Sequence, residues 1–99
     1  MKQVYMVHIR LPEVFTYEFY ALIPKQREIV NALLEERKLL SYSLDMERKQ
    51  VWAIFELADE KELSRVLNTF PILHDVQLEV HLLAFHNQAP IHLPDLILN

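Results

Sequence analysis

The sequence predicts an α+β fold in which a four-stranded antiparallel sheet carries two helices on one face. Three observations predict it. Segments rich in β-branched and aromatic residues alternate with segments of helical apolar spacing, in the order β-α-β-β-α-β. The chain has 99 residues, the length of one domain. Apolar residues make up 52% of the chain, enough to form a core.

The N-terminal half gives the first strand and the longer helix. Residues Gln3–Leu11 are rich in Val, Tyr and Ile and end at a proline, which favours a strand. Thr16 is placed to cap a helix that runs to about Lys38. Pro24 lies inside it and predicts a kink or a 3₁₀ entry turn. The stripe that this helix buries is Phe19, Leu22, Ile23, Gln26, Ile29, Val30, Leu33 and Leu34.

A hairpin follows. Its predicted strands are Leu39–Met46 and Gln50–Leu57, and a polar, glycine-free loop around Glu47–Lys49 joins them. We expect a loop of about three to five residues built on a type I turn, because the tight primed turns favour glycine.

The second helix and the last strand complete the fold. Asp59 caps the helix with Glu62 as its capping-box partner, and Pro71 ends it. Its buried stripe is Leu63, Val66, Leu67 and Phe70. The last strand is Val76–Phe85. This order is that of the ferredoxin-like, or split βαβ, arrangement, in which the strands lie side by side as 4-1-3-2.

Residues 1–99 thus form a single predicted domain, with a core over about residues 2–86. Residues 87–99 follow as a tail without a clear element. Its apolar residues are too numerous for a free tail, so we expect it to dock on another surface. These residues are Ile91, Leu93, Leu96, Ile97 and Leu98.

Composition excludes several classes of function. Lys and Arg number 10 against 14 Asp and Glu, so the net charge is −4 and a nucleic-acid partner is not expected. The chain has no cysteine, which excludes disulfides, thiolate metal sites and cysteine nucleophiles. It has no glycine, which excludes glycine-rich phosphate loops and the nucleophile elbow. Without a long apolar run or a signal-like N-terminus, we expect a cytoplasmic protein that does not bind membranes.

The two faces of the predicted sheet differ in character. The face toward the helices is apolar: Tyr5, Val7, Ile9, Val51, Ala53, Phe55, Val76, Leu78, Val80 and Leu82. The opposite face, called here the open face, mixes apolar and titratable residues: Val4, Met6, His8, Arg10, Ser41, Ser43, Trp52, Ile54, Glu56, Gln77, Glu79, His81 and Leu83. This mixture favours a second copy packed sheet to sheet, with a partly polar cavity for a small molecule. The plain alternative is a solvent-facing side of an antiparallel sheet.

The second half of the chain resembles the muconolactone isomerase family. The residues that carry the resemblance are Phe55-Glu56-Leu57, Leu63, Leu67, the Phe70-Pro71 stop and Leu78-Glu79-Val80. The family has a Phe-Asp-Val strand end, leucines at those spacings, a Leu-Pro stop and an Ile-Glu-Val strand. The spacing is gapless from Phe55 to His86, and the resemblance covers about residues 3–92.

The resemblance implies a dimeric α+β barrel that assembles into a homodimer or a higher homo-oligomer. It implies a proton shift within an unsaturated lactone that bears a carboxylate, without metal or organic cofactor. Two stretches depart from the family. Leu40–Gln50 lacks the family's tryptophan, arginine and glycine residues, and Leu73-His74-Asp75 replaces an aromatic-Pro-Tyr sequence. Both changes would alter a substrate pocket more than the fold.

The open face supplies candidates for such chemistry. Glu79 is the candidate base and His8 the proton shuttle, because histidine titrates near neutrality and burial between two sheets would raise the carboxyl pKa of Glu79. Arg10, or Arg48 from the hairpin, is the candidate partner of a substrate carboxylate.

Three other residues have weaker roles. His81 is a second candidate acid and substrate contact, and Trp52 and Tyr42 are candidate walls for a ring. Each candidate also has a structural interpretation: a cross-sheet hydrogen bond for His8, an interface ion pair for Glu79 and Arg10, and a packing anchor for Trp52.

Three functions therefore stay open. If the protein is an enzyme, it is expected to be an isomerase that acts on a small anionic lactone. The second hypothesis is a non-catalytic ligand-binding or assembly module, which the missing hairpin aromatics favour. The third is a cofactor-free monooxygenase of the related barrel type, by analogy of fold alone.

Two further kinds of site are not expected. His81, His86 and His92 lack the helical spacing of a zinc site, so no metal site is predicted. Ser41 and Ser43 lack the surroundings of a nucleophile.

Overall fold

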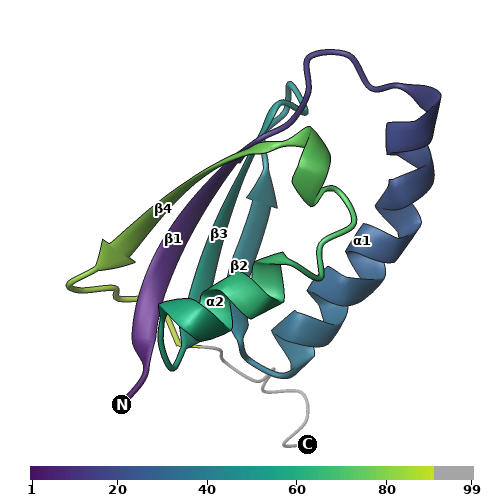
Figure 1. Cartoon of the computed structure of the whole chain (residues 1–99). Coiled ribbons are helices and arrows are strands. Elements are labelled where there is room, and N and C mark those ends of the chain that lie inside the picture. Colours follow the sequence, from purple (N-terminus) through teal and green to yellow (C-terminus); the bar gives the residue numbers. More distant parts are fainter. Residues whose placement is uncertain (91–99) are drawn as a thin grey trace, which may run out of the picture.

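The structure, a computed structural model, describes residues 1–90, and these form the predicted βαββαβ order. The strands are β1 (Gln3–Arg10), β2 (Leu39–Leu44), β3 (Gln50–Leu57) and β4 (Gln77–Leu83). The helices are α1 (Tyr17–Glu35) and α2 (Glu60–Leu67), and a short 3₁₀ turn, η1 (Leu73–Asp75), precedes β4. The predicted α+β, ferredoxin-like fold is confirmed, and Figure 1 shows both helices on one side of the sheet.

The strands lie in the order β2-β3-β1-β4, all antiparallel, as predicted. The register pairs Val7 of β1 with Ala53 of β3 and Val80 of β4, so these residues share the face toward the helices. The neighbouring pairs, His8 with Trp52 and Glu79, therefore share the open face. The assignment of these residues to two faces is thus confirmed. The predicted cover of the apolar face is not complete, because Leu78, Val80 and Leu82 of β4 are 36%, 42% and 58% exposed.

The core lies between the sheet and the helices. Tyr5, Val7 and Ile9 of β1 are fully buried, and so are Ala53 and Phe55 of β3. The helices contribute a buried stripe, and the segment after α2 adds a phenylalanine to the same cluster: Val30, Leu33, Leu63, Val66, Leu67 and Phe70. The register and the amphipathic helices therefore place one continuous apolar layer under one face of the sheet.

Helix α1 begins where the sequence predicts. The Thr16 side-chain oxygen accepts a hydrogen bond of 3.1 Å from the N–H of Phe19, which is an N-cap. The helix is α-helical through Pro24, so the expected 3₁₀ entry turn does not occur there. The carbonyl that this proline leaves without a donor is that of Tyr20, an exposed residue, so water can satisfy it.

Helix α1 ends three residues earlier than predicted. Arg37 takes the left-handed conformation with φ 61°, and the N–H of Lys38 donates to the carbonyl of Leu33 at 3.0 Å. The N–H of Arg37 donates to Leu34 at 3.1 Å, which completes a Schellman motif. Because the chain has no glycine, an arginine occupies the position that glycine usually takes.

The hairpin loop spans residues 45–49, within the predicted length. Asp45 organises it: its carboxylate accepts from the N–H groups of Lys49 at 2.8 Å and Gln50 at 3.0 Å. Its carbonyl accepts from the N–H of Arg48 at 3.0 Å, and Arg48 itself has φ 60°. The loop therefore closes on an aspartate and a left-handed arginine.

Helix α2 is capped as predicted and ends early. The Asp59 carboxylate accepts from the N–H of Glu62 at 2.9 Å, and the Glu62 carboxylate accepts from the N–H of Ala58 at 2.8 Å. The capping box thus forms, but the Glu62 carboxylate accepts from the N–H of Ala58, one residue before the cap, instead of from that of Asp59. The helix stops at Leu67, before Phe70, because Thr69 and Phe70 donate to Val66 and Leu67 in tighter turns.

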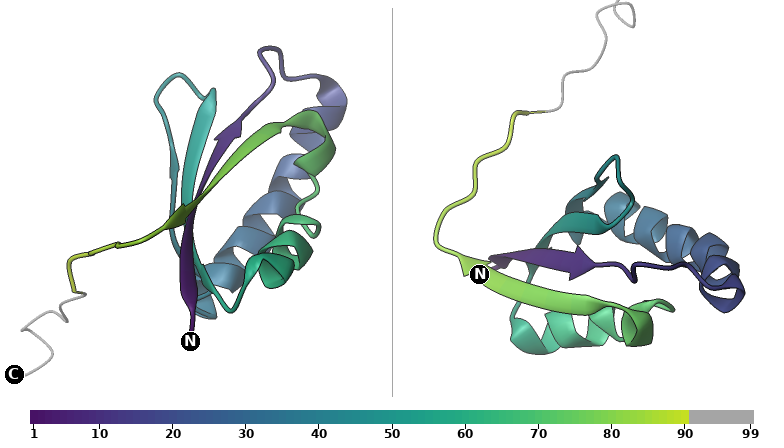
Figure 2. Two further views of the ribbon diagram at one scale, coloured as in Figure 1. Left: turned by 60° about the vertical axis from the view of Figure 1, so that its left-hand side comes forward. Right: turned by 90° about the horizontal axis from the view of Figure 1, so that it is seen from above.

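β4 is shorter than predicted and lies at the edge of the sheet, with both of its faces exposed. Residues 84–90 lead away from the sheet without regular structure (Figure 2). The expectation of a docking tail rests mainly on residues 91–99, which lie outside the described part of the chain.

Candidate functional site

Five of the seven sequence-predicted site residues lie on the open face of the sheet; the other two, Tyr42 and Arg48, line a different hollow. His8 and Arg10 come from the central strand β1, and Trp52 comes from β3 on one side of it. Glu79 and His81 come from β4 on the other side. The register that sequence alone could not supply sets His8 directly opposite both Trp52 and Glu79. The candidates therefore form one cluster across three neighbouring strands.

His8 is held by its neighbours on β3. Its Nε2 atom lies 2.8 Å from Oε1 of Gln50, and its ring stacks on the Trp52 indole with centroids 5.4 Å apart and an angle of 9° between the planes. An amide oxygen only accepts, so Nε2 carries the hydrogen in this arrangement and Nδ1 remains available. The predicted cross-sheet hydrogen bond of His8 is thus present.

Glu79 is engaged by a residue of its own strand. Its Oε1 atom lies 2.7 Å from Nε2 of His81, two positions along β4 on the same face. This hydrogen bond from His81 is the largest cause that lowers the pKa of the Glu79 carboxyl, and the charge of His81 lowers it further. The charges of His8 and Arg10 act in the same direction. In the single chain the Glu79 carboxyl pKa is therefore lowered, and the predicted rise depends on a second sheet covering it.

The structure brings Arg10 close to this pair. His8, Arg10 and Glu79 line one shallow depression of about 110 Å³, together with Gln77 and Leu78. Sites for small organic molecules usually span roughly 300–1,000 Å³. One chain therefore supplies a part of such a site: a cation, an imidazole and a carboxylate around a small hollow.

Apolar side chains share the open face with this depression. Ile54 is buried, with 6% of its surface exposed, whereas Trp52 is 38% exposed. Val4, Met6 and Leu83 are half-buried. The open face thus combines titratable groups with apolar area that solvent reaches.

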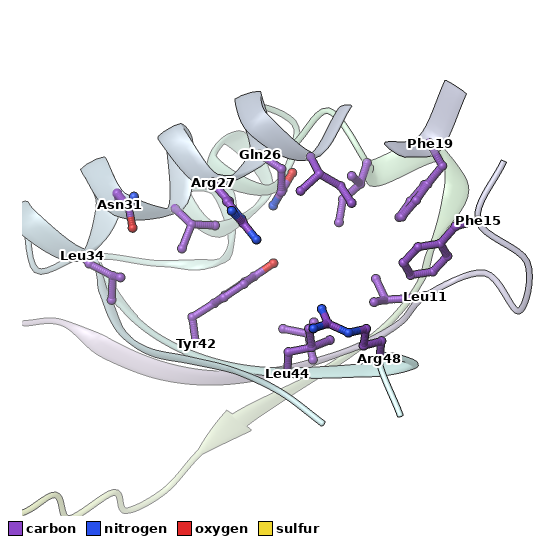
Figure 3. A pocket seen from close by; sticks show the side chains of 14 residues that line it. Leu11, Phe15, Phe19, Gln26, Arg27, Asn31, Leu34, Tyr42, Leu44 and Arg48 are labelled. Carbon is purple, nitrogen blue, oxygen red and sulfur yellow. The ribbon is translucent and has the colours of Figure 1, made fainter. Parts of the chain in front are cut away.

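A second hollow lies on the opposite side of the sheet, and the sequence reasoning missed it. We call it the helix–hairpin pocket. It has a volume of about 390 Å³ and lies between α1 and the β2–β3 hairpin (Figure 3). Arg48 lines it, and so does Tyr42, which was predicted to wall the open-face site. The signal for it in the sequence was Gln26, an amide within the apolar stripe of the helix.

Residues 1–90 contain neither a candidate metal cluster nor a candidate membrane-spanning helix. No group of three or more His, Asp or Glu side chains is placed to hold a metal ion there, and His92 lies outside this part of the chain. No helix in the same range has the length and apolar character needed to cross a membrane.

Comparisons with known proteins do not assign a family. The chain matches none of the models of known protein families. A search of curated proteins finds no relative either. The resemblance to muconolactone isomerases stays a prediction.

Proposed function

We propose that the chain forms a homodimer through its open face and binds a small anionic organic molecule between the paired sheets. The observation that carries this proposal is the convergence of His8, Arg10 and Glu79 on one depression in an otherwise partly apolar face. Arg10 would hold the anionic group of the ligand, and Trp52 would contact its apolar body.

The composition of the open face supports self-association. A twofold interface brings the same patch together from both copies, so a patch that carries both signs of charge can pair with itself. The open face carries the cation Arg10 beside the anion Glu79, and Trp52 adds an exposed aromatic ring. Paired sheets pack about 10 Å apart, which would enlarge a hollow of about 110 Å³ and bury its walls.

The residues at this depression would support an intramolecular proton shift on a lactone. The Glu79 carboxylate would remove a proton from carbon, and a protonated His8 would return one to another carbon. A proton would then pass from Glu79 to His8 and restore both groups, so that no oxidant, reductant or leaving group is needed. Covering by a second sheet would raise the carboxyl pKa of Glu79 by removing water. His81 would orient the carboxylate through the hydrogen bond that it already makes.

A non-catalytic binding module on the same fold is the second candidate. One observation favours it: the hydrogen bond from His81 lowers the pKa of the Glu79 carboxyl, which makes the carboxylate a weaker base. In this case the cluster would hold an anion and an interface ion pair without turning a substrate over.

The test is turnover of muconolactone, followed by ultraviolet absorbance, by the wild type, Glu79→Gln and the control Glu47→Gln. Glu47 is an exposed residue of the hairpin loop. The isomerase proposal expects Glu79→Gln to remain a dimer and lose turnover by about a hundredfold or more, the contribution typical of a general base. A folded wild-type dimer without turnover would contradict the isomerase and favour the binding module. Dissociation of Glu79→Gln into monomers would make Glu79 structural.

A further inference from the structure

We propose that the helix–hairpin pocket is a second ligand site, which takes a carboxylate attached to a single ring or a short apolar chain. It lies between α1 and the sheet, on the face opposite the open face, and has a volume of about 390 Å³ (Figure 3). That volume is within the range of roughly 300–1,000 Å³ for small-molecule sites, near its lower end. This site does not depend on the function proposed for the open face.

The first observation is the amide of Gln26. Only 5% of this residue is exposed, and neither Nε2 nor Oε1 has a hydrogen-bond partner within residues 1–90. Buried polar groups are nearly always paired, because an unpaired one loses its hydration without compensation. Figure 3 shows the amide at the wall of the pocket. Within residues 1–90 only the Tyr42 hydroxyl interacts with this amide, and it does so outside normal hydrogen-bond geometry, so most of the donor and acceptor capacity of Gln26 is left unused.

Tyr42 supplies a second polar group. It lies on β2, across the pocket from α1, and its hydroxyl points into the hollow (Figure 3). Burial raises the pKa of the Tyr42 hydroxyl, and the nearby Gln26 amide offsets this rise only in part. The hydroxyl therefore keeps its proton at neutral pH and can donate a hydrogen bond to an anionic oxygen.

Two arginines supply the charge. Arg27 from α1 and Arg48 from the hairpin loop line the pocket from opposite sides, and both are exposed (Figure 3). Neither forms an ion pair with a residue of the described chain, 1–90. A guanidinium group pairs with a carboxylate through two parallel hydrogen bonds. The donors and the charges at this site thus match a carboxylate.

The backbone at Arg48 adds an independent observation. Arg48 has φ 60°, a conformation that costs an ordinary residue roughly 1–2 kcal/mol and that glycine adopts freely. Such conformations persist where the surrounding structure or a function requires them. Here the strained residue places a cation at the pocket.

The remaining walls of the pocket indicate what kind of apolar group the ligand carries. They are mainly apolar and include aromatic rings: Leu11, Phe15, Phe19, Ile23, Val30, Leu44 and Ile72. The ligand is therefore expected to bury a ring or a short chain against these walls and to turn its carboxylate toward Tyr42 and the arginines.

The probe is phenylacetate, titrated into ¹⁵N-labelled wild-type protein and followed by NMR. Its neutral analogue 2-phenylethanol tests the need for the charge, and hexanoate tests a chain in place of the ring. We expect saturable shifts at Gln26 and Tyr42, with phenylacetate bound at least tenfold more tightly than 2-phenylethanol. Equal affinity for phenylacetate and 2-phenylethanol would contradict the proposed preference for a carboxylate. NMR shifts confined to the open face would contradict a site in the helix–hairpin pocket.

Gln26→Leu gives a test with two opposite readouts. Leucine removes an unpaired polar group from the core, so the melting temperature of the free protein should rise by several degrees. The same variant should bind phenylacetate about tenfold more weakly, as expected for the loss of a ligand hydrogen bond. A lower melting temperature with unchanged affinity would mean that Gln26 has a structural partner such as water, and the site would be wrong.

Arg48→Gly and Arg37→Gly form a matched pair, because both remove an arginine near φ 60° and only Arg48 lines the pocket. Only Arg48→Gly should weaken phenylacetate binding, by about tenfold or more. An equal loss of phenylacetate affinity in both variants would mean that Arg48 acts only through the net charge of the protein, and this would contradict the proposal. Phenylacetate binding should also survive Glu79→Gln, so failure of the open-face function and failure of this site are distinguishable.

Discussion

The imidazole of His8 and the indole of Trp52 stack across β1 and β3, with ring centroids 5.4 Å apart and planes 9° from parallel. Trp52 is the chain's single tryptophan, so its fluorescence reports on the open face alone. The two proposed sites are therefore separable by one optical signal.

A ligand of the open face should change the emission of Trp52, and a ligand of the helix–hairpin pocket should not. We expect muconolactone, as an anionic lactone, to shift or quench the emission in a saturable way. Phenylacetate should leave the emission unchanged at concentrations that saturate the NMR shifts at Tyr42. A Trp52 response to phenylacetate that parallels those NMR shifts would mean that the two sites are not independent.

The left-handed arginines predict two stabilising substitutions. Arg37→Gly and Arg48→Gly should each raise the free energy of unfolding by about 0.5–1 kcal/mol. Glycine removes the conformational cost of the left-handed backbone in the folded state. A part of this gain is offset, because glycine also increases the entropy of the unfolded chain. Urea unfolding measures the change. Arg27→Gly, inside α1, is the control and should destabilise by about 1 kcal/mol. Destabilisation by both test substitutions would contradict the assigned backbone.

The Asp45 carboxylate predicts an acid-dependent loss of stability. The N–H groups of Gln50 and Lys49 donate to it and lower the pKa of its carboxyl. A carboxyl with a lowered folded-state pKa stabilises the fold above its ordinary pKa, and this contribution is lost as the pH falls through the folded-state value.

Asp45→Asn keeps a side-chain oxygen and removes the charge, so stability should depend less on pH than in the wild type. The urea midpoints at about pH 7 and about pH 3 measure this difference. Asp75→Asn is the control, because Asp75 makes no side-chain hydrogen bond within residues 1–90 and should leave the wild-type pH dependence unchanged. An Asp45→Asn variant with the full wild-type difference would show that Asp45 does not carry it.

Two phenylalanines should differ sharply in their contribution to stability. Phe55 is fully buried between the sheet and the helices, so Phe55→Ala should cost about 3–5 kcal/mol. Phe85 is 67% exposed, so Phe85→Ala should change stability by less than about 0.5 kcal/mol. Urea unfolding distinguishes them. A large loss from Phe85→Ala would mean that another surface covers this residue.

Local chemistry explains what the sequence could predict. Thr16, Asp45 and Asp59 act on backbone groups within five residues, so their caps and turns are visible in the chain. Strand alternation assigned His8, Trp52 and Glu79 to one face, because side chains alternate along a strand. The α1 and α2 ends were less accurate, since left-handed arginines and 3₁₀-type turns in a chain without glycine leave weak signals.

The remainder depended on contacts between distant segments. The hydrogen bond of His8 to Gln50 follows from the β1–β3 register, which no local pattern fixes. The helix–hairpin pocket is a space left between α1 and the hairpin, next to Gln26 and Tyr42. The Gln26 amide in an apolar stripe was the one visible sign of it. Its meaning required the three-dimensional structure, which shows that the amide has no partner within residues 1–90.

The central claim is that the open face pairs with itself, and sedimentation velocity tests it most directly. Wild type and Trp52→Glu are compared at micromolar concentration, with Tyr17→Glu on the exposed surface of α1 as the control; both substituted side chains are exposed in the single chain. The account predicts a dimer or higher oligomer for wild type and Tyr17→Glu, and a monomer for Trp52→Glu that circular dichroism shows to be folded. A monomeric wild type, or an unchanged oligomer in Trp52→Glu, would contradict it.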